Sequence, residues 1–118
     1  MAIHSYKDLL VWQKSIQLVK DIYEVCNQLP KEEIYGISSQ IKRSAVSLPS
    51  NIAEGYGRKN TKEYIQFLRI AYGSACELET QLILIRDIFN IETSDCEHQL
   101  TEVQKMLYTL FKKLETST

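Results

Sequence analysis

Apolar residues recur at steps of three and four along most of this chain, the spacing that places side chains on one face of an α-helix. The pattern divides into four segments. The first follows Ser5, an N-cap candidate with Asp8 three positions later, and continues to about Leu29, before Pro30. Its apolar stripe consists of Leu9, Trp12, Ile16, Val19, Tyr23, Cys26 and Leu29. We therefore expect a first helix that ends at about residue 29.

The second segment starts between Lys31 and Ser38. Its stripe consists of Ile37, Ile41, Ala45, Leu48 and Ile52. Gly55 and the glycine two positions later can supply a C-cap, so we expect the helix to end there. Pro49 lies inside the segment, where it removes a backbone hydrogen bond and predicts either a kink or a local break. The sequence leaves both alternatives open.

The third and fourth segments each start with a capping pattern. Asn60 and Glu63 form such a pair before the strongest periodic run of the chain, which extends to residue 89. This run has its stripe at Leu68, Ala71, Ala75, Leu78, Leu82, Ile85 and Phe89. Ser94 and Glu97 form a similar box before a stripe of Leu100, Val103, Leu107, Leu110 and Leu114. We expect residues 115–118 to fray.

Four amphipathic helices with short connections predict an all-α fold, an antiparallel up-down-up-down four-helix bundle. No alternating strand pattern competes with this interpretation, and four Gly and two Pro are few for a protein with many turns. We expect a single domain over residues 1–118, held together by burial of the four stripes.

The end of the third segment is apolar on more than one face. The residues concerned are Leu82, Ile83, Leu84, Ile85, Ile88, Phe89 and Ile91. Either this helix is the most central one, or its second face binds another copy of the chain. In the second case Ile83, Leu84 and Ile88 form the oligomer interface. Tyr64, Phe67 and Tyr72 lie off the main stripe and favour that case.

The amino-acid composition excludes several classes of protein. Hydrophobic residues make up 44% and charged residues 25%, as in ordinary soluble domains. The 14 Lys and Arg nearly balance the 15 Asp and Glu, which excludes a uniformly basic nucleic-acid-binding domain. The start has no basic stretch followed by an apolar one, and the longest aliphatic run, residues 82–85, is too short to span a membrane. We expect a cytoplasmic protein with no membrane partner.

Residues that bear chemistry are sparse. Three widely spaced cysteines with no C-x-x-C predict reduced thiols and neither a disulfide framework nor a zinc site. A di-metal bundle needs two Glu-x-x-His pairs. The two histidines are His4 and His98, and Asp95 takes the place of the glutamate before His98. No G-x-S-x-G and no glycine-rich phosphate loop occurs. We therefore expect no enzyme, no metal and no cofactor.

Basic residues are concentrated in the middle of the chain. Residues 41–69 contain six, against Glu54 and Glu63, which gives this segment a charge of +4. The six are the candidate nucleic-acid-binding residues Lys42, Arg43, Arg58, Lys59, Lys62 and Arg69. The turn near residues 57–61 should place Arg58, Lys59 and Lys62 at one end of the bundle, with Lys42 and Arg43 about four turns away. The alternative is a solvated basic face.

Residues 47–58, SLPSNIAEGYGR, resemble the signature of the four-helix-bundle family encoded in intervening sequences of bacterial 23S ribosomal RNA, often labelled ribosomal proteins. Residues 6–14, YKDLLVWQK, and 35–45, YGISSQIKRSA, resemble the family as well, as do residues 63–64 and 67–68. The resemblance covers residues 6–90, and the fourth segment matches only in its pattern. Within the signature we interpret Pro49, Asn51, Glu54 and Gly55 as structural, with Asn51 and Glu54 satisfying backbone groups freed by the proline.

This resemblance implies a cytoplasmic bacterial protein that assembles as a ring-like homopentamer. The chain is also similar to the accessory variability determinant proteins of retroelements, strongly basic pentamers whose implied partners are RNA and a reverse transcriptase. The net charge of −1 departs from that pattern. Two hypotheses follow: a non-enzymatic oligomer associated with structured RNA through the basic segment, or an oligomeric protein-interaction scaffold with no nucleic-acid role.

Overall fold

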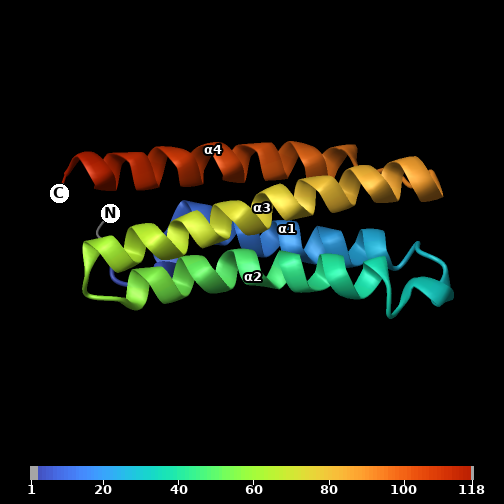
Figure 1. Cartoon of the computed structure of the whole chain (residues 1–118), viewed down its shortest axis with the longest axis horizontal. Helices are drawn as coiled ribbons and strands as arrows, with labels where there is room; N and C mark the ends of the chain where they lie inside the picture. Colours follow the sequence, from blue (N-terminus) through green and yellow to red (C-terminus); the bar gives the residue numbers. More distant parts are fainter. Residues whose placement is uncertain (1–2, 118) are drawn as a thin grey trace.

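A computed structural model describes residues 3–117 and confirms the all-α class. The helices are α1 (Leu10–Cys26), α2 (Ile37–Gly57), α3 (Thr61–Phe89) and α4 (Ser94–Thr116), with the short 3-10 helices η1 (Tyr6–Asp8) and η2 (Lys31–Glu33). Consecutive α-helices run in opposite directions, and both chain ends lie at the same end of the bundle (Figure 1). α1 packs against α2 and α4, and α3 packs against the same two helices. The bundle measures 46 × 24 × 19 Å.

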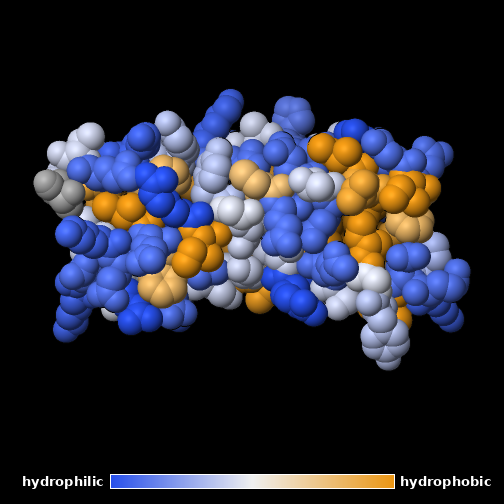
Figure 2. Space-filling view, viewed as in Figure 1, coloured by the Kyte–Doolittle hydropathy of each residue, from blue (hydrophilic) through white to orange (hydrophobic). Residues whose placement is uncertain are grey.

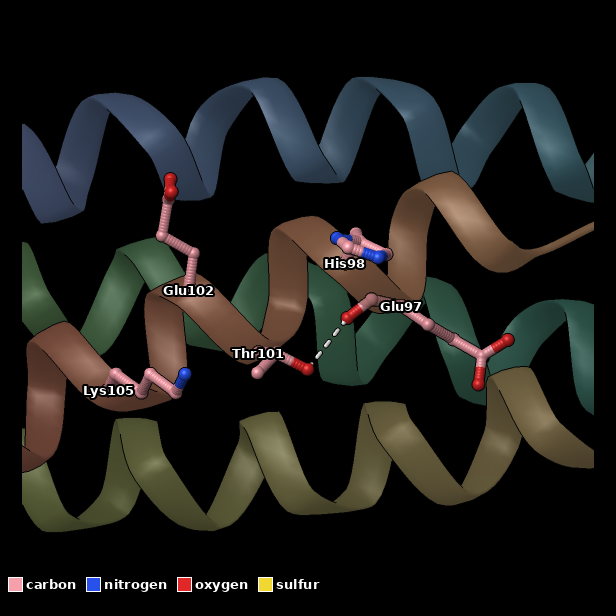
Figure 3. Close-up of a pocket in the computed structure, with 5 residues that line it drawn as sticks. All are labelled: Glu97, His98, Thr101, Glu102 and Lys105. Atoms are coloured by element: carbon pink, nitrogen blue, oxygen red, sulfur yellow. Dashed lines mark hydrogen bonds between the residues drawn. The ribbon is translucent and has the colours of Figure 1, made fainter.

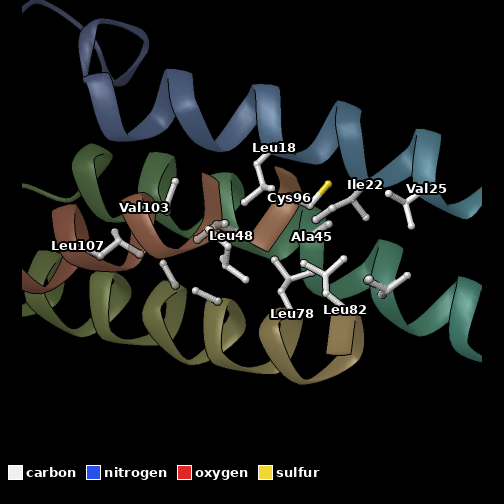
Figure 4. Packing of buried hydrophobic residues seen from close by; sticks show 14 of the residues in the cluster. Leu18, Ile22, Val25, Ala45, Leu48, Leu78, Leu82, Cys96, Val103 and Leu107 are labelled. Atoms are coloured by element: carbon white, nitrogen blue, oxygen red, sulfur yellow. The ribbon is translucent and has the colours of Figure 1, made fainter. Parts of the chain in front are cut away.

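The predicted stripes of the last three helices form the core (Figure 4). Thirteen of their residues are fully buried: Ile41, Ala45, Leu48, Ile52, Leu68, Ala71, Ala75, Leu78, Leu82, Ile85, Leu100, Val103 and Leu107. α3 has the predicted bounds, because the Asn60 side chain accepts a hydrogen bond from the Glu63 amide at 3.1 Å. At the other end Asn90 takes a left-handed conformation, φ 57°, which stops the helix.

The predicted stripe of the first helix is wrong except at Cys26, which is buried. The structure buries the adjacent row, Val11, Ser15, Leu18, Ile22 and Val25, together with Cys26. Trp12, Ile16 and Val19 are only half-buried and Tyr23 is exposed. The sequence does not favour the buried row, because the polar Ser15 interrupts its apolar residues. Its hydroxyl donates to the Val11 carbonyl at 2.7 Å, so burial leaves no unpaired polar group.

Both ends of the first helix also differ from the prediction. Ser5 and Asp8 form a capping box, but it caps η1. Leu9 is extended, and α1 starts only after it. At the other end the helix stops at Cys26, and a turn leads to Pro30. Local hydrogen bonds of the turns at both ends replace the helical ones.

The start of α4 corrects a second capping prediction. Thr93, and not Ser94, is the N-cap residue, and its hydroxyl donates to the Glu97 carboxylate at 2.7 Å. Near the other end Phe111 is buried in place of the predicted Leu110 and Leu114, which are half-buried. The helix includes residues 115 and 116, so the expected fraying there is wrong. Residue 118 lies outside the described residues.

α2 continues through Pro49, which excludes the local break. Nearby, the Asn51 amide donates to the Ser47 carbonyl at 2.8 Å and to the Ser47 hydroxyl at 2.9 Å. That hydroxyl pairs with Ser74 of α3 at 2.9 Å. The interpretation that Asn51 and Glu54 satisfy the backbone carbonyl freed by Pro49, that of Ala45, is therefore wrong. Asn51 holds Ser47, which joins α2 to α3, and Glu54 pairs with Arg58.

Candidate nucleic-acid interface

The bundle separates charges that the sequence interleaves. We divide the described residues at the helix midpoints, residues 18, 47, 75 and 105, and call the half that holds both chain ends the terminal end and the other half the far end. The terminal end comprises residues 3–17, 48–74 and 106–117. It contains eight basic residues: Lys7, Lys14, Arg58, Lys59, Lys62, Arg69, Lys112 and Lys113. Against them stand Asp8, Glu54, Glu63 and Glu115, which leaves a charge of +4.

The far end has the opposite sign. Its α1 and α2 part, residues 19–46, contains four basic and four acidic residues and is neutral. Its α3 and α4 part, residues 76–104, contains Arg86 and seven acidic residues, a charge of −6. Lys105 lies at the boundary. A net charge of −1 therefore conceals a molecule with a basic end and an acidic corner.

The structure brings together four of the six predicted basic residues. Arg58, Lys59, Lys62 and Arg69 lie at the terminal end. Lys42 and Arg43 lie beyond the midpoint of α2 at the far end, so the six do not form one patch. Sequence reasoning missed the basic residues contributed by the two chain ends, Lys7, Lys14, Lys112 and Lys113. Only the antiparallel packing of α1 and α4 places Lys7, Lys112 and Lys113 at the same end as the α2–α3 turn, while Lys14 lies nearer the middle of the bundle and pairs with Glu102.

The two arginines of this end are engaged within the chain. Arg58 contacts the carboxylates of Glu54 at 3.0 Å and Glu63 at 3.9 Å, and it lies 5.0 Å from the Phe67 ring centre. Arg69 pairs with Glu115 and lies 4.6 Å from the Phe111 ring centre. The Arg69 guanidinium lowers the pKa of the Glu115 carboxyl by hydrogen bonding and by its charge. The positive field of both arginines is thus partly compensated.

Four lysines at the terminal end have no acidic partner. Within residues 3–117, the side chains of Lys7, Lys59, Lys62 and Lys113 form no ion pair, whereas Lys14 pairs with Glu102 and Lys112 with Glu115. All four are exposed. Beside them Tyr56 and Tyr64 pack edge to face with ring centres 6.0 Å apart, and burial raises the pKa of Tyr64. These ammonium groups are the ones free to contact phosphate oxygens.

The family model of the 23S rRNA-intervening sequence protein matches residues 7–109. This chain belongs to that family. The match includes most of α4, the helix that resembles the family only in pattern. A solved structure from the S23 ribosomal protein family of Bacteroides thetaiotaomicron, itself of unknown function, is 26% identical with a TM-score of 0.80. The similarity covers 87% of this chain and 99% of that one. No curated protein matches.

The other two predicted basic residues, Lys42 and Arg43, lie in separate surroundings on α2. The Lys42 ammonium lies 4.9 Å from the Tyr23 ring centre, between α2 and α1. Arg43 lines a cavity of about 350 Å³ with Gln40, Ser44, Ser47 and Glu77. Both sites lie far from the α2–α3 turn, so they do not extend the basic surface of the terminal end.

The residues weighed for metal chemistry do not converge. No group of three His, Cys, Asp or Glu side chains suited to a metal ion occurs among the described residues. Burial and nearby acidic groups raise the pKa of the Cys96 thiol to about 11. Figure 3 shows His98 and Glu102 along one side of α4 and the Glu97 carboxylate reaching away from them. They line a cavity of about 450 Å³ without forming a ligand set.

The predicted oligomer interface is exposed in the single chain. Ile88 is 64% exposed and Leu84 42%, while Ile83 is half-buried. α3 packs only against α2 and α4, so a central position does not explain its second apolar face. Figure 2 shows apolar side chains gathered at the end of the bundle where α2 begins and α3 ends. Ile34 and Tyr35 are also exposed in the connection to α2. Among the described residues no helix has the length and hydrophobicity to cross a membrane.

Proposed function

We propose that this protein is a cytoplasmic, non-enzymatic member of its family that associates with structured RNA through the terminal end. The observation that carries the proposal is the +4 charge of that end, where four lysines form no ion pair among the described residues. Lysine–phosphate contacts release counterions, which supplies affinity without sequence specificity and makes that affinity depend on salt. The bundle fixes the backbone of these lysines, so binding has to order only their side chains.

Self-association strengthens this proposal. A cyclic assembly, the homopentamer that the family resemblance implies, would repeat the terminal end once per copy. If the ring axis runs along the bundle, all copies present this end on the same side. Several +4 surfaces then act on one RNA, and the effective concentration of each raises the total affinity. Leu84 and Ile88 supply the apolar contact surface for such an assembly.

A second function is favoured by different residues. An oligomeric scaffold that binds a partner protein, such as a reverse transcriptase, would use exposed apolar side chains and the acidic corner of the far end. Ile34 and Tyr35 are 58% and 93% exposed, and the corner has a charge of −6. An acidic corner disfavours RNA but suits a basic protein surface.

Fluorescence anisotropy with a labelled ribosomal RNA hairpin over a salt series separates the two functions. The test variant carries Lys59→Glu, Lys62→Glu and Lys113→Glu. Arg58 is left unchanged because its charge is already matched. A matched control carries Lys20→Glu, Lys31→Glu and Lys42→Glu, the same change of net charge at the far end.

We expect the wild type to bind, with an affinity that falls steeply as salt rises. The terminal-end variant should lose at least tenfold in affinity, and the far-end variant much less. Equal losses would show that net charge alone matters and would remove the site. Failure of the wild type to bind at low salt would reject RNA association and favour the scaffold.

A further inference from the structure

An aromatic residue on the outer side of α4 has no evident role in the bundle core. Tyr108 is 49% exposed. Its ring centre lies 5.3 Å from that of Phe111 and 6.3 Å from that of Tyr72 on α3. Phe111 is buried and also packs edge to face on Tyr72. Two neighbouring rings therefore hold Tyr108 in place while about half of its surface stays open to a ligand.

Lysines lie on both sides of this ring along the helix. Lys105 and Lys112 are three residues before and four residues after Tyr108, so all three share one face of α4 over about 10 Å. The Lys112 ammonium is 5.7 Å from the Tyr108 ring centre. The same ammonium lies 3.7 Å from a carboxylate oxygen of Glu115, and Glu115 also forms an ion pair with Arg69. Lys105 forms no ion pair within residues 3–117.

A groove between α3 and α4 runs beside the ring. It has a volume of about 410 Å³ and is lined by Tyr72, Thr101, Gln104, Lys105, Tyr108 and Thr109. Figure 3 shows Thr101 and Lys105 on the neighbouring turns of α4. The Gln104 amide is only weakly engaged, at 3.5 Å from Glu79. The groove thus combines an aromatic surface, flanking ammonium groups and side chains able to hydrogen-bond a base edge.

We propose that this groove binds an unpaired nucleotide, whose base stacks on Tyr108 while Lys105 and Lys112 contact the adjoining phosphates. The inference rests on the proposed RNA association and names the form of RNA that is bound: a single-stranded loop or end next to a helix. An unpaired base has a free face for an aromatic ring, whereas a base within a duplex is already stacked. Lys112 and Lys113 belong to the terminal end, so the groove continues that basic surface.

The chain contains a matched control for this ring. Tyr23 is 40% exposed and has the Lys42 ammonium 4.9 Å from its ring centre. It lies on α1 in the far half, away from the basic end. If the loss of any exposed tyrosine beside a lysine weakens binding, replacing Tyr23 will weaken it too. If Tyr108 is a stacking site, only the replacement of Tyr108 will weaken binding.

The experiment compares binding of a 5′-labelled single-stranded oligonucleotide of about 12 adenosines with binding of a blunt duplex of equal length, by anisotropy. The variants are Tyr108→Leu, Tyr108→Phe and Tyr23→Leu, each checked by thermal unfolding. Leucine keeps apolar packing but removes the ring. We expect Tyr108→Leu to bind the single strand about tenfold more weakly with unchanged duplex affinity, because only an unpaired base stacks on the ring that is removed. Tyr108→Phe and Tyr23→Leu should bind as the wild type does.

Two results would overturn the inference. One is a Tyr108→Leu variant that binds the single strand as tightly as the wild type; the other is an equal loss for both RNAs. In either case the Lys59, Lys62 and Lys113 variant shows separately whether the terminal end binds RNA. If the wild type binds neither RNA, the proposed function and this inference fail together.

Discussion

At the scale of single residues, Gly55 sets how closely α2 and α3 approach. A Cβ at this position would lie 2.7 Å from the Cβ of Phe67 and 3.3 Å from the Tyr64 carbonyl oxygen. Gly55→Ala should therefore destabilise the fold by about 1–3 kcal/mol, because the two helices must move apart. Gly73→Ala is the matched control. Its Cβ meets nothing within 4 Å, and it should stabilise by up to about 1 kcal/mol. Urea unfolding followed by circular dichroism measures both, and a Gly55→Ala protein as stable as the wild type contradicts the close-contact explanation.

The thiols differ in their environment. Cys76 is exposed, whereas Cys26 and Cys96 are buried, and burial raises the pKa of both buried thiols. A thiol reagent at pH 8 should modify Cys76 quickly, and Cys26 and Cys96 only when the protein unfolds. Cys76→Ser should abolish the fast phase. Two fast-reacting thiols in the folded protein would contradict the burial of the pair.

The raised pKa of the Cys96 thiol predicts that the free energy of unfolding falls at alkaline pH. The pKa of its thiol is raised in the folded state from 9.0 to about 11, so the unfolded chain releases this proton first. The contribution to stability is complete below about pH 9 and falls as the pH rises towards 11. Urea unfolding at pH 8 and pH 10 should show this fall, and Cys96→Ala should reduce it. A fall of the same size in Cys96→Ala would assign it to other groups.

At the scale of helices, side-chain caps determine how well the first and last residues of a helix can be predicted from the sequence. The bounds of α3 follow from its sequence because Asn60 caps it and Asn90 ends it through local contacts. Asn60→Ala should lower the free energy of unfolding by about 1 kcal/mol, while Asn60→Asp should retain it, since a carboxylate accepts the same hydrogen bond. Thermal unfolding measures both. Equal losses in the two variants would mean that the side-chain oxygen is not what stabilises the start of α3.

The row that α1 buries could not be predicted in this way. Two adjacent rows of similar hydrophobicity run along the helix, and the packing of α2 and α4 selects the one that contains Ser15. The rejected row, with Trp12, Ile16 and Val19, instead lines a shallow cavity of about 310 Å³ shared with α2. A pattern on one helix gives its periodicity, but its orientation depends on its neighbours.

At the scale of the whole molecule, the exposed end of α3 predicts self-association. Leu84→Arg combined with Ile88→Arg should reduce the mass in solution towards the 13.7 kDa of one chain, because an interface cannot bury two unpaired charges. Leu10→Arg is the control, since Leu10 is also half-exposed but lies on α1 at the terminal end. Light scattering coupled to size exclusion gives the masses. A wild-type mass of 13.7 kDa would reject the assembly, and an unchanged oligomer in the double variant would reject this interface.

The sequence by itself determined the fold class, the four helices, the stripes of α2 and α3 and the first part of the α4 stripe, because helical periodicity and capping depend on residues a few positions apart. It also placed the chain in its family through residues 47–58. The tertiary structure decided which row of α1 is buried and which residues make up the candidate RNA surface. The length of α2 already separates Lys42 and Arg43 from Lys59, as the sequence predicts, but only the antiparallel arrangement brings Lys112 and Lys113 to the same end as Lys59. Charge acts through space, so a net charge of −1 becomes a basic end and an acidic corner only once the helices are packed.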